Sequence, residues 1–441
     1  MRPESFNGSL LRAMSIFSRV KDWLSLGRAE DDEDDLRSAR SAWASPVRKP
    51  PYEVDLPRFS GFANEGDIGE SVDPQGSEGR RKLGRAFPLA QPIGNLRQFA
   101  GRRELLANAI RAIEERRLHL VLFGDRGIGK TSLLNIIALL AADARYQVRY
   151  SSCSEGSNFD QTFRAIARDI PLLYHRSSDP TSDQVESGNT LADLLDERPV
   201  TPSLFSEILE GVAGTRLLII LDEFDRAESS DFRRSVAELI KNLSDRGSRA
   251  QILIGGVGHN LAELIRHIPS IRRSLLGVHV SKMPDEDLDE ILSIGTAISK
   301  LPFAANGRRA LIHAANGSPY LTNLFAYQAT SRAIDRHLNE VPLSAVQDSL
   351  RETLAGIRQR LDMAALAQLD ALKAALPPAD IERIAGHAMN NFNSLEPADA
   401  AFVTTKLGAR LDASWSDAEG NFLFRDDSVP LALWLSRIVE L

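Results

Sequence analysis

The sequence predicts an α/β fold built on a parallel β-sheet, and two observations support this prediction. From about residue 87 to residue 284, stretches with apolar residues at helical spacing alternate with short apolar runs of strand length. The first of these runs leads into a glycine-rich loop, and the third ends in two acidic residues. Strands that alternate with helices favour a parallel sheet, because the chain must cross over the sheet before each new strand.

Five apolar runs are the expected strands. They are bounded by polar or glycine-containing segments, as buried strands usually are. The runs are residues 118–123, 146–152, 217–221, 251–257 and 278–283. The polar stretch 177–202 interrupts the alternation between the second and third strands, and we expect it to be an exposed insertion.

The strand signal ends at Pro284, and helical patterns dominate the rest of the chain. The expected helices of a lid-like domain are residues 285–300, 308–315, 319–337 and 344–361. In the last part, 362–441, Trp415 and two phenylalanines flank a turn at Gly420-Asn421, which is typical of the hairpin wing of a winged helix. The expected domains are therefore an α/β domain (87–284), a helical lid (285–361) and a winged-helix-like domain (362–441).

The first 86 residues differ from the rest of the chain. Apolar residues recur at helical spacing between Leu10 and Leu24, which predicts one amphipathic helix within residues 1–26. Residues 27–86 are acidic and then rich in Pro, Gly, Ser and charge, as in a flexible tether. The helix could pack on the α/β domain, dock on a partner or lie on a membrane surface. Its few basic residues favour the first two.

Composition excludes several classes of protein. The 441 residues fit two or three domains, and no apolar run is long enough to span a membrane. A single cysteine, Cys153, excludes an internal disulfide framework and a cysteine-built zinc site. No export signal is recognisable at the N-terminus, so a cytoplasmic location is expected. The net charge of −7 argues against a generally nucleic-acid-binding surface.

The glycine loop carries the strongest chemical signal. Its sequence GDRGIGKTS fits the phosphate-loop pattern G-x-x-x-x-G-K-[ST], and it lies between an apolar strand and a helical run, as this motif requires. The glycines let backbone N–H groups point at phosphate, the lysine faces the β- and γ-phosphates, and the threonine hydroxyl is a ligand for Mg²⁺. The expected nucleotide-binding residues of the loop are Gly124, Asp125, Arg126, Gly127, Ile128, Gly129, Lys130, Thr131 and Ser132, with Thr131 also a metal ligand and Lys130 also catalytic.

The third strand, in RLLIILDEFDR, delivers the two acids at its carboxyl end. Ligands of open α/β sheets bind at this end of the strands. We expect Asp222 to hold Mg²⁺ through its water shell and Glu223 to orient or deprotonate the attacking water. Together with the phosphate loop, these acids predict a P-loop NTPase.

Two further positions are candidates for contact with the γ-phosphate. Asn260, or less favourably His259, follows the fourth strand and could touch the γ-phosphate or the attacking water, although a helix cap is an equal alternative for Asn260. Arg272 and Arg273 lie just before the fifth strand, where an arginine finger would lie. Exposed helix charges are the alternative for this pair.

These motifs together resemble bacterial AAA+ ATPases related to the STAND and origin-recognition groups. The likeness covers about residues 87–441 and rests on FPLAQPIGNLRQFAGRREL, GDRGIGKTS, LDEFDR, HIPSIRRSLLGVHVSKM and NGSPYLTNLF. It implies an AAA+ nucleotide-binding domain with a five-stranded parallel sheet at 87–284, followed by the lid and the winged-helix-like domain.

The resemblance also implies particular contacts with the nucleotide. Phe99, Gly101 and Arg102 belong to the segment that lies over the adenine in this family, and Pro319 belongs to the G-x-P element through which the lid approaches the nucleotide. Tyr320 stands where replication initiators tend to carry a lid arginine, which favours the STAND-like assignment. No guanine-reading N-K-x-D motif is present, so the implied cofactors are ATP and Mg²⁺.

Three functions fit the sequence. The favoured one is a nucleotide-driven switch in bacterial signalling or phage defence. A DNA-associated ATPase of replication or transposition is the second, and an assembly or adaptor ATPase that recruits an effector through its N-terminal helix is the third. Residues 362–441 hold six basic residues against at least eleven acids, which disfavours DNA as a partner there. An arginine finger in trans would require a homo-oligomer.

Overall fold

The computed structural model describes residues 77–89, 91–177, 188–195, 197–256, 269–416 and 422–440. All of them fall within one unit, Val72–Leu441. The expected amphipathic helix at residues 10–24 lies outside the described residues. None of the described helices combines the length and the apolar character that a membrane crossing requires.

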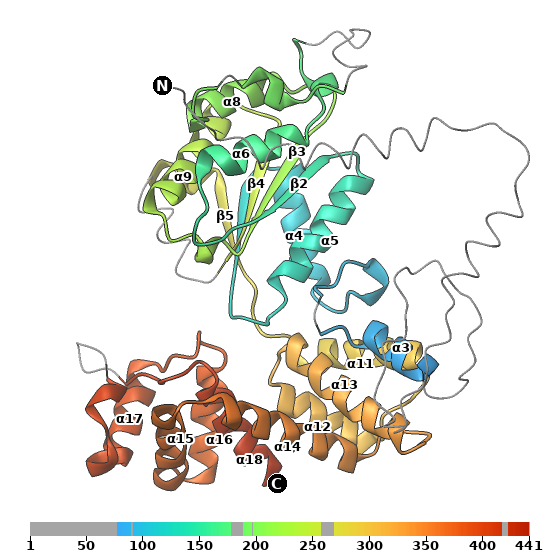
Figure 1. The fold of residues 1–441 in the computed structure, drawn as a ribbon, viewed down its shortest axis with the longest axis vertical. Coiled ribbons are helices and arrows are strands. Elements are labelled where there is room, and N and C mark those ends of the chain that lie inside the picture. The colour runs from blue at the N-terminus through green and yellow to red at the C-terminus, as the bar shows by residue number, and fades with distance from the viewer. Residues whose placement is uncertain are drawn as a thin grey trace, which may run out of the picture. The chain divides into compact units, whose positions relative to one another are not determined.

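Five parallel strands form one sheet in the order β2-β3-β4-β1-β5 (Figure 1). The strands are β1 His119–Phe123, β2 Gln147–Ser152, β3 Leu217–Asp222, β4 Ala250–Gly256 and β5 Leu275–His279. Every residue of the central strands β3 and β4 is buried, as expected where helices cover both faces of a parallel sheet. The predicted parallel five-stranded sheet is therefore confirmed.

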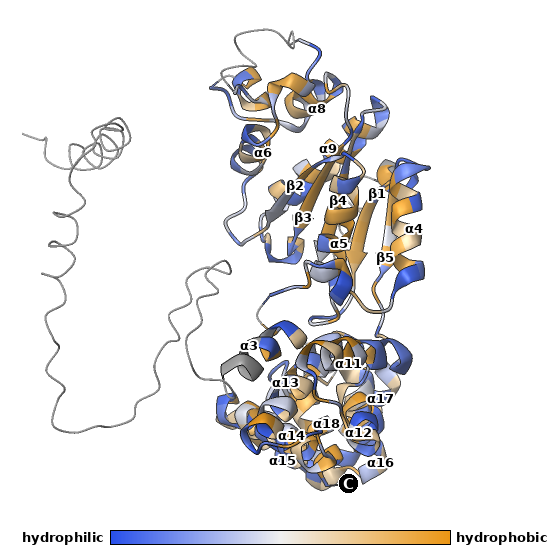
Figure 2. Cartoon of the chain, turned by 90° about the vertical axis from the view of Figure 1, so that its right-hand side faces the viewer, coloured by the Kyte–Doolittle hydropathy of each residue, from blue (hydrophilic) through white to orange (hydrophobic). Residues whose placement is uncertain are grey.

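Helices cover the two faces of this sheet. Alternate residues of β3 point to opposite faces: Leu218 and Ile220 pack with α4 and α5, whereas Ile219 and Leu221 pack with α6, α8 and α9. Figure 2 shows the strands as hydrophobic ribbons between helices that carry hydrophilic residues. These helices are α4 Arg103–Glu114, α5 Lys130–Asp143, α6 Phe159–Arg168, α8 Pro202–Glu210 and α9 Ser230–Asp245.

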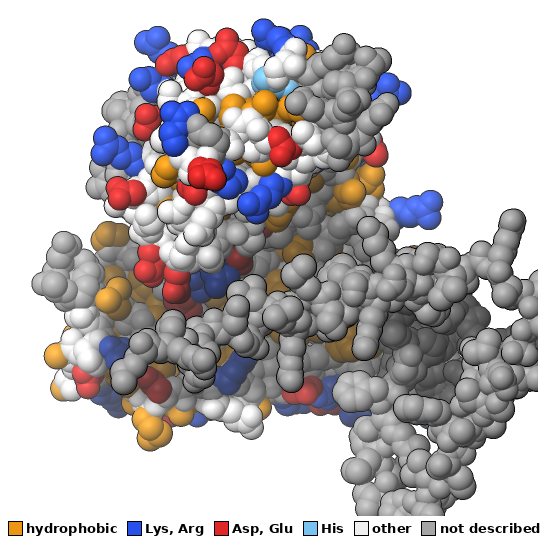
Figure 3. Space-filling model, turned by 45° about the horizontal axis from the view of Figure 1, so that its top comes forward, with side chains coloured by type: hydrophobic (Ala, Val, Ile, Leu, Met, Phe, Trp, Pro, Cys, Tyr) orange, Lys and Arg blue, Asp and Glu red, His pale blue; other side chains and the backbone are white. Residues whose placement is uncertain are grey.

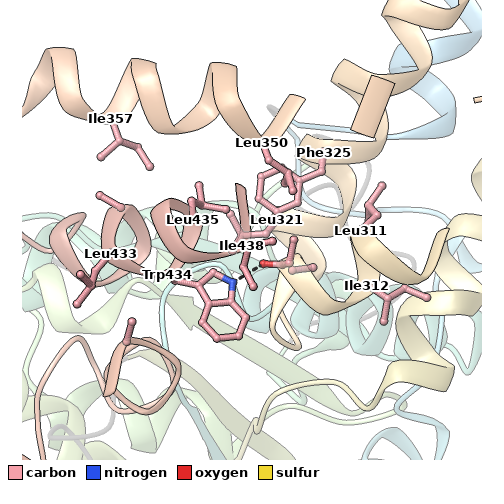
Figure 4. Packing of buried hydrophobic residues seen from close by; sticks show 14 of the residues in the cluster. Leu311, Ile312, Leu321, Phe325, Leu350, Ile357, Leu433, Trp434, Leu435 and Ile438 are labelled. Atoms are coloured by element: carbon pink, nitrogen blue, oxygen red, sulfur yellow. Dashed lines mark hydrogen bonds between the residues drawn. The ribbon is translucent and has the colours of Figure 1, made fainter. Parts of the chain in front are cut away.

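The rest of the described chain is helical. The four expected lid helices are present as α11 Asp285–Ser299, α12 Ala305–Ala315, α13 Pro319–Asp335 and α14 Leu343–Arg360. They are followed by α15 Met363–Ala375, α16 Pro378–Ala388, α17 Pro397–Leu407 and α18 Val429–Val439. Both groups share one hydrophobic core (Figure 4), and the indole Nε1 of Trp434 in α18 donates a 2.9 Å hydrogen bond to the carbonyl of Ala314 in α12. The core therefore continues across the expected domain boundary at residue 361.

The segment expected to be a tether ends earlier than predicted. Residues Ser77–Ala86 form the helix α3, which packs against α11 and α13. Phe87 follows it with a fully buried ring, and Gly295 of α11 has no side chain to exclude that ring, since a Cβ there would lie 2.0 Å from it. Sequence analysis missed α3 because only three apolar residues bury this segment, and many of the residues around them are charged.

Two other expectations in the α/β domain need correction. The fifth strand is Leu275–His279 rather than 278–283, and it lies at the edge of the sheet. The apolar residues after it misled the prediction because they pack elsewhere: Met283 is buried in the core of the lid. The stretch 177–202 is not simply an exposed insertion. Leu191, Leu195 and Val200 are buried against the α6 and α8 face of the sheet, and these anchors are too sparse to give a helical or strand pattern.

The expected hairpin wing at 414–424 is described only in part. Ser416 and Phe422 form an isolated antiparallel bridge, and the N–H of Leu423 donates to the carbonyl of Trp415 at 2.7 Å. The turn at Gly420-Asn421 lies outside the described residues. The winged-helix assignment therefore stays a prediction.

Candidate nucleotide-binding site

The phosphate loop connects β1 to α5 at the carboxyl edge of the sheet. The helix α5 begins at Lys130, and Gly129 precedes it in the left-handed region with a φ of 95°. Gly127 is also left-handed, with a φ of 71°. Side chains rarely adopt these angles, so the glycines allow a tight curl that leaves the first N–H groups of α5 open to an anion.

Lys130 lies inside this curl. Its ammonium group donates to the carbonyls of Gly124 at 2.9 Å and Asp125 at 2.8 Å. Burial lowers the pKa of Lys130, and the carboxylates of Asp225 and Asp222 partly oppose that effect. The ammonium group therefore lies at the loop, close to where a phosphate group would bind.

Asp222 ends β3 with a buried carboxylate. One of its oxygens accepts the N–H of Glu223 at 2.8 Å, and the other accepts the hydroxyl of Tyr150 from β2. Burial, followed by this bond to Asp222, raises the pKa of the Tyr150 phenol. Gly255 of β4 leaves room for the carboxylate, because a Cβ there would lie 2.5 Å from its oxygen. Asp222 is thus held in one orientation.

Glu223 follows in a different environment. It is a left-handed residue with a φ of 52°, and its side chain is half exposed. One carboxylate oxygen accepts the hydroxyl of Ser152 at 3.0 Å and forms an ion pair with Arg226, also at 3.0 Å. The side chain expected to orient the attacking water is therefore held by two groups in this conformation.

The residues present fit a magnesium ion. Mg²⁺ takes only one or two protein oxygens and fills its shell with water and phosphate oxygens. Thr131 lines the cavity beside the loop, and its hydroxyl has no hydrogen-bond partner within the described ranges, whereas Asp222 supplies a fixed carboxylate nearby on β3. No cluster of three or more His, Cys, Asp or Glu side chains that could hold a metal ion occurs in the described part of the chain.

A cavity of about 270 Å³ opens between the phosphate loop, the segment before α4 and the lid. Of the predicted residues it contains Phe99, Arg102, Gly127, Gly129, Lys130, Thr131, Ser132 and Pro319. Sequence analysis missed a further set: Pro88, Leu89, Gln91, Pro92, Ile93, Ala100, Met283, Ile291, Tyr320 and Asn323. This lining is apolar on one side and phosphate-binding on the other, which suits a nucleotide base joined to a phosphate chain.

The proline-containing segment before α4 could have been found from its sequence. It reads FPLAQPIGN, too rich in Pro and Gly for a helix, and it directly precedes the family segment at Phe99. The N–H of Ile93 donates to the hydroxyl of Ser132 at 3.1 Å, which ties this segment to the start of α5.

Arg102 and Gly101 join the cavity to the lid. The N–H of Gly101 donates to Glu290 of α11 at 2.9 Å, and the guanidinium of Arg102 donates to the carbonyl of Ser281 at 2.8 Å. Burial lowers the pKa of Arg102 to about 10, an effect that the nearby Asp287 carboxylate partly opposes. A Cβ at Gly101 would overlap Asp287, so glycine is required for this approach.

The lid also touches the phosphate loop itself. A Cβ added to Gly129 would lie 3.5 Å from Pro319, and one added to Gly127 would lie 3.3 Å from the Cβ of Tyr320. Both lid residues are in the first turn of α13, which Ser318 caps by accepting the N–H of Leu321. The G-x-P element therefore lies beside the phosphate loop.

A contact from the C-terminal helices reaches the same loop. The carboxylate of Asp125 accepts the N–H of Phe392, from the segment between α16 and α17, at 2.6 Å. Burial raises the pKa of Asp125, and the bond from Phe392 opposes this shift. Arg126 forms a longer pair with Asp427 at 3.7 Å, and both of these side chains are largely exposed. No local sequence signal identifies these contacts.

The remaining candidates lie elsewhere. Asn260 and His259 are outside the described residues. Arg272 and Arg273 are exposed at the end of the short turn Pro269–Arg273, before β5 and so at the amino edge of the sheet. The phosphate loop follows β1 at the opposite edge, and the paired strands β1 and β5 are each five residues long. Roughly 17 Å of strand therefore separates the two arginines from their own loop.

Comparison with known protein families finds one match within the α/β domain. Residues 98–254 match the family model of the AAA ATPase domain. Among curated proteins, none matches the sequence.

Several solved structures are similar at low identity. The RuvB Holliday junction branch migration motor of Thermotoga maritima has 14% identity and a TM-score of 0.39, over 76% of this chain and 90% of that chain. A Walker-type ATPase of Pyrococcus abyssi has 15% identity and a TM-score of 0.48, over 79% and 99%. The ORC2 protein of Aeropyrum pernix has 17% identity and a TM-score of 0.44, over 81% and 97%.

The assignment rests on the family match and on the site. The matched residues contain the phosphate loop, the acidic strand and most of the sheet that positions them. Residues 98–254 therefore match an AAA ATPase domain, and with the phosphate loop and the acidic strand inside that match the chain is an ATP hydrolase.

Proposed function

We propose that this ATPase is a magnesium-dependent molecular switch that passes its nucleotide state to a protein partner. The observation that carries the proposal is the phosphate loop's double contact. The lid touches it through Tyr320, and the C-terminal helices touch it through the bond from Phe392 to Asp125. A change in the loop on nucleotide binding or hydrolysis would therefore act on both helical parts at once.

The site residues have separate roles in this proposal. Lys130 and the N–H groups at the start of α5 bind the phosphates, while Phe99 and the proline-containing segment enclose the base. Thr131 and Asp222 hold Mg²⁺, which when bound neutralises charge on the β- and γ-phosphates. Glu223 orients the attacking water after it leaves Arg226 and Ser152.

The switch assignment is favoured over a DNA-driven role for the C-terminal helices. Residues 362–441 remain rich in acids, and the described loop between α16 and α17 contacts Asp125 of the phosphate loop. A winged-helix-like domain used in this way acts as an internal clamp on the nucleotide domain. The proposal also includes a role in bacterial signalling or phage defence and a homo-oligomeric active form. The N-terminal helix is the element that we expect to bind the effector.

The clamp is the hydrogen bond from the Phe392 amide to Asp125, and it can be tested by changing the acceptor, Asp125. We expect Asp125→Ala to speed the dissociation of bound nucleotide about tenfold, because a hydrogen bond to a charged group contributes about 1.5–3 kcal/mol and its loss frees the C-terminal helices from the loop. Stopped-flow release of a fluorescent ADP analogue measures this rate.

Two matched variants make the test specific. Asp125→Asn keeps a hydrogen-bond acceptor for the Phe392 amide and should change the rate much less. Asp427→Asn removes only the exposed pair with Arg126, which is worth at most about 1 kcal/mol. Equal release rates for Asp125→Ala and the unmodified protein would refute the clamp.

A further inference from the structure

The amino edge of the sheet, opposite the phosphate loop, has an unusual charge pattern. Each of the five strands is preceded by a segment of three residues that contains at least one arginine. The segments before β1 and β5 contain two arginines each, and those before β2, β3 and β4 contain one each, which makes seven. None of these fifteen positions holds an acid. We call this set the arginine row. It consists of Arg116, Arg117, Arg145, Arg216, Arg249, Arg272 and Arg273.

The sheet order turns these separate segments into one line. In space the row runs from Arg145 before β2, through β3 and β4, to the pair before β1 and then to the pair before β5. Neighbouring strands are about 4.8 Å apart, so four steps give a line of roughly 19 Å. The positive charges are therefore regularly spaced along one edge.

Six of the seven arginines are available for binding. All except Arg216 are exposed, and none of the six makes an ion pair or a side-chain hydrogen bond with any described residue. Arg216 is half-buried, and it donates to the hydroxyl of Tyr146 at 2.8 Å. Elsewhere many arginines are paired, as Arg246 is with Glu210 and Arg308 is with Asp289.

Acids lie beside the row without neutralising it. Glu114, Glu115 and Asp143 stand at the ends of the helices that lead into β1 and β2, and Asp245 ends α9 before β4. None of them forms an ion pair with an arginine of the row among the described contacts. On the face that Figure 3 presents, basic and acidic side chains are interspersed. In the five segments themselves, every charged residue is an arginine.

We propose that the arginine row binds the phosphate backbone of a nucleic acid. Guanidinium groups bind phosphate in a bidentate way, and an extended line of them fits consecutive phosphates of one strand. The residues between the arginines are mostly small, such as Gly214, Ser248 and Ser274, and none of the large exposed apolar side chains found among the described residues lies in these segments. A protein interface would need such apolar anchors.

The row is distinct from the ATP site of its own chain and from the C-terminal helices. Arg272 and Arg273 are also the candidates for a finger at a neighbouring subunit's ATP site, so the test below uses Arg145 and Arg249. The row lies on the opposite edge of the sheet from the phosphate loop, so a nucleic acid and ATP can bind at the same time. The acidic balance of residues 362–441 does not affect it, because the row belongs to the α/β domain. Contact with phosphates alone predicts binding without sequence preference.

Salt dependence of binding tests this inference with the full-length protein. The probes are a fluorescently labelled single-stranded DNA, its duplex and an RNA of the same sequence, followed by anisotropy from about 50 to 200 mM salt. We expect at least one probe to bind. The double variant Arg145→Ala, Arg249→Ala should bind it roughly tenfold more weakly, with a slope of log K against log salt that is shallower by about 1.4 to 1.8.

Control variants separate charge from folding. Arg145→Lys, Arg249→Lys keeps both charges and should keep most of the slope, whereas Arg309→Ala removes an exposed arginine of α12 and should change nothing. ATP turnover without nucleic acid should be unchanged in all of these variants, since none of the residues lies at the nucleotide cavity. Which probe binds best identifies the kind of nucleic acid.

Three results would overturn the inference. The first is that no probe binds in a salt-dependent way. The second is that the slope is the same with and without Arg145 and Arg249. The third is that poly-glutamate binds through these arginines while all three nucleic acids fail, which would assign the row to an acidic protein.

Discussion

Lys130→Ala should lose magnesium-dependent ATP binding by about 10²-fold or more. The ammonium group is buried at the loop, where it donates to the carbonyls of Gly124 and Asp125, and an alanine leaves the β- and γ-phosphates without this charge. Glu223→Gln should retain ATP but lower its turnover by about 10²- to 10⁴-fold, because the amide cannot accept a proton from the attacking water. Equilibrium binding and single-turnover hydrolysis measure the two effects separately.

The pair of variants has a matched control in the same network. Arg226→Ala removes the ion pair to Glu223 but leaves both the acid and the phosphate loop intact, so it should keep ATP binding and retain turnover. If Lys130→Ala binds Mg-ATP normally, or if Glu223→Gln turns ATP over at the unmodified rate, the assignment of these residues is wrong.

The double variant Arg272→Ala, Arg273→Ala should lower ATP turnover by about 10³-fold, because an arginine finger supplied by a neighbouring subunit stabilises charge on the γ-phosphoryl group. Within one chain the two arginines are a strand length away from the phosphate loop, and the lid offers Tyr320 rather than an arginine at its contact with the loop. If these arginines act as a finger, as we propose, they must act in trans.

Mixing two inactive proteins tests the shared site directly. The Arg272→Ala, Arg273→Ala protein has an intact pocket, and the Glu223→Gln protein has an intact finger. Activity should reappear when the two are combined, with Arg309→Ala in place of the finger variant as a fully active control. A double variant that hydrolyses ATP normally by itself would instead place these arginines among ordinary surface charges.

Local patterns predicted much of the fold and the phosphate-binding half of the site. The strands, the glycine loop and the acids Asp222 and Glu223 are each encoded within about ten consecutive residues. Capping by Ser318 and the proline at the first position of α13 likewise mark the start of a lid helix locally. These features can be predicted from local sequence because the residues that determine them are close together in the chain.

The contacts between segments far apart in the chain could not be predicted from local sequence patterns. The bond between Asp125 and Phe392 joins residues 267 positions apart, and that between Tyr150 and Asp222 joins residues 72 positions apart. The arginine row exists only because the strand order brings five separate segments to one edge. In each case tertiary packing, rather than any local periodicity, determines which side chains meet.

Amide hydrogen exchange at Phe392 is the most direct measurement of the proposed switch. Its N–H donates to Asp125, whose backbone carbonyl also accepts from Lys130. In the proposed switch, the ammonium of Lys130 turns from this carbonyl to the γ-phosphate in the ATP state, and the loss of that bond loosens the contact between Asp125 and Phe392. The account predicts that Phe392 exchanges at least about tenfold faster in the Glu223→Gln protein with Mg-ATP than in the same protein with Mg-ADP. Equal exchange in the two nucleotide states, with both nucleotides bound, would contradict it.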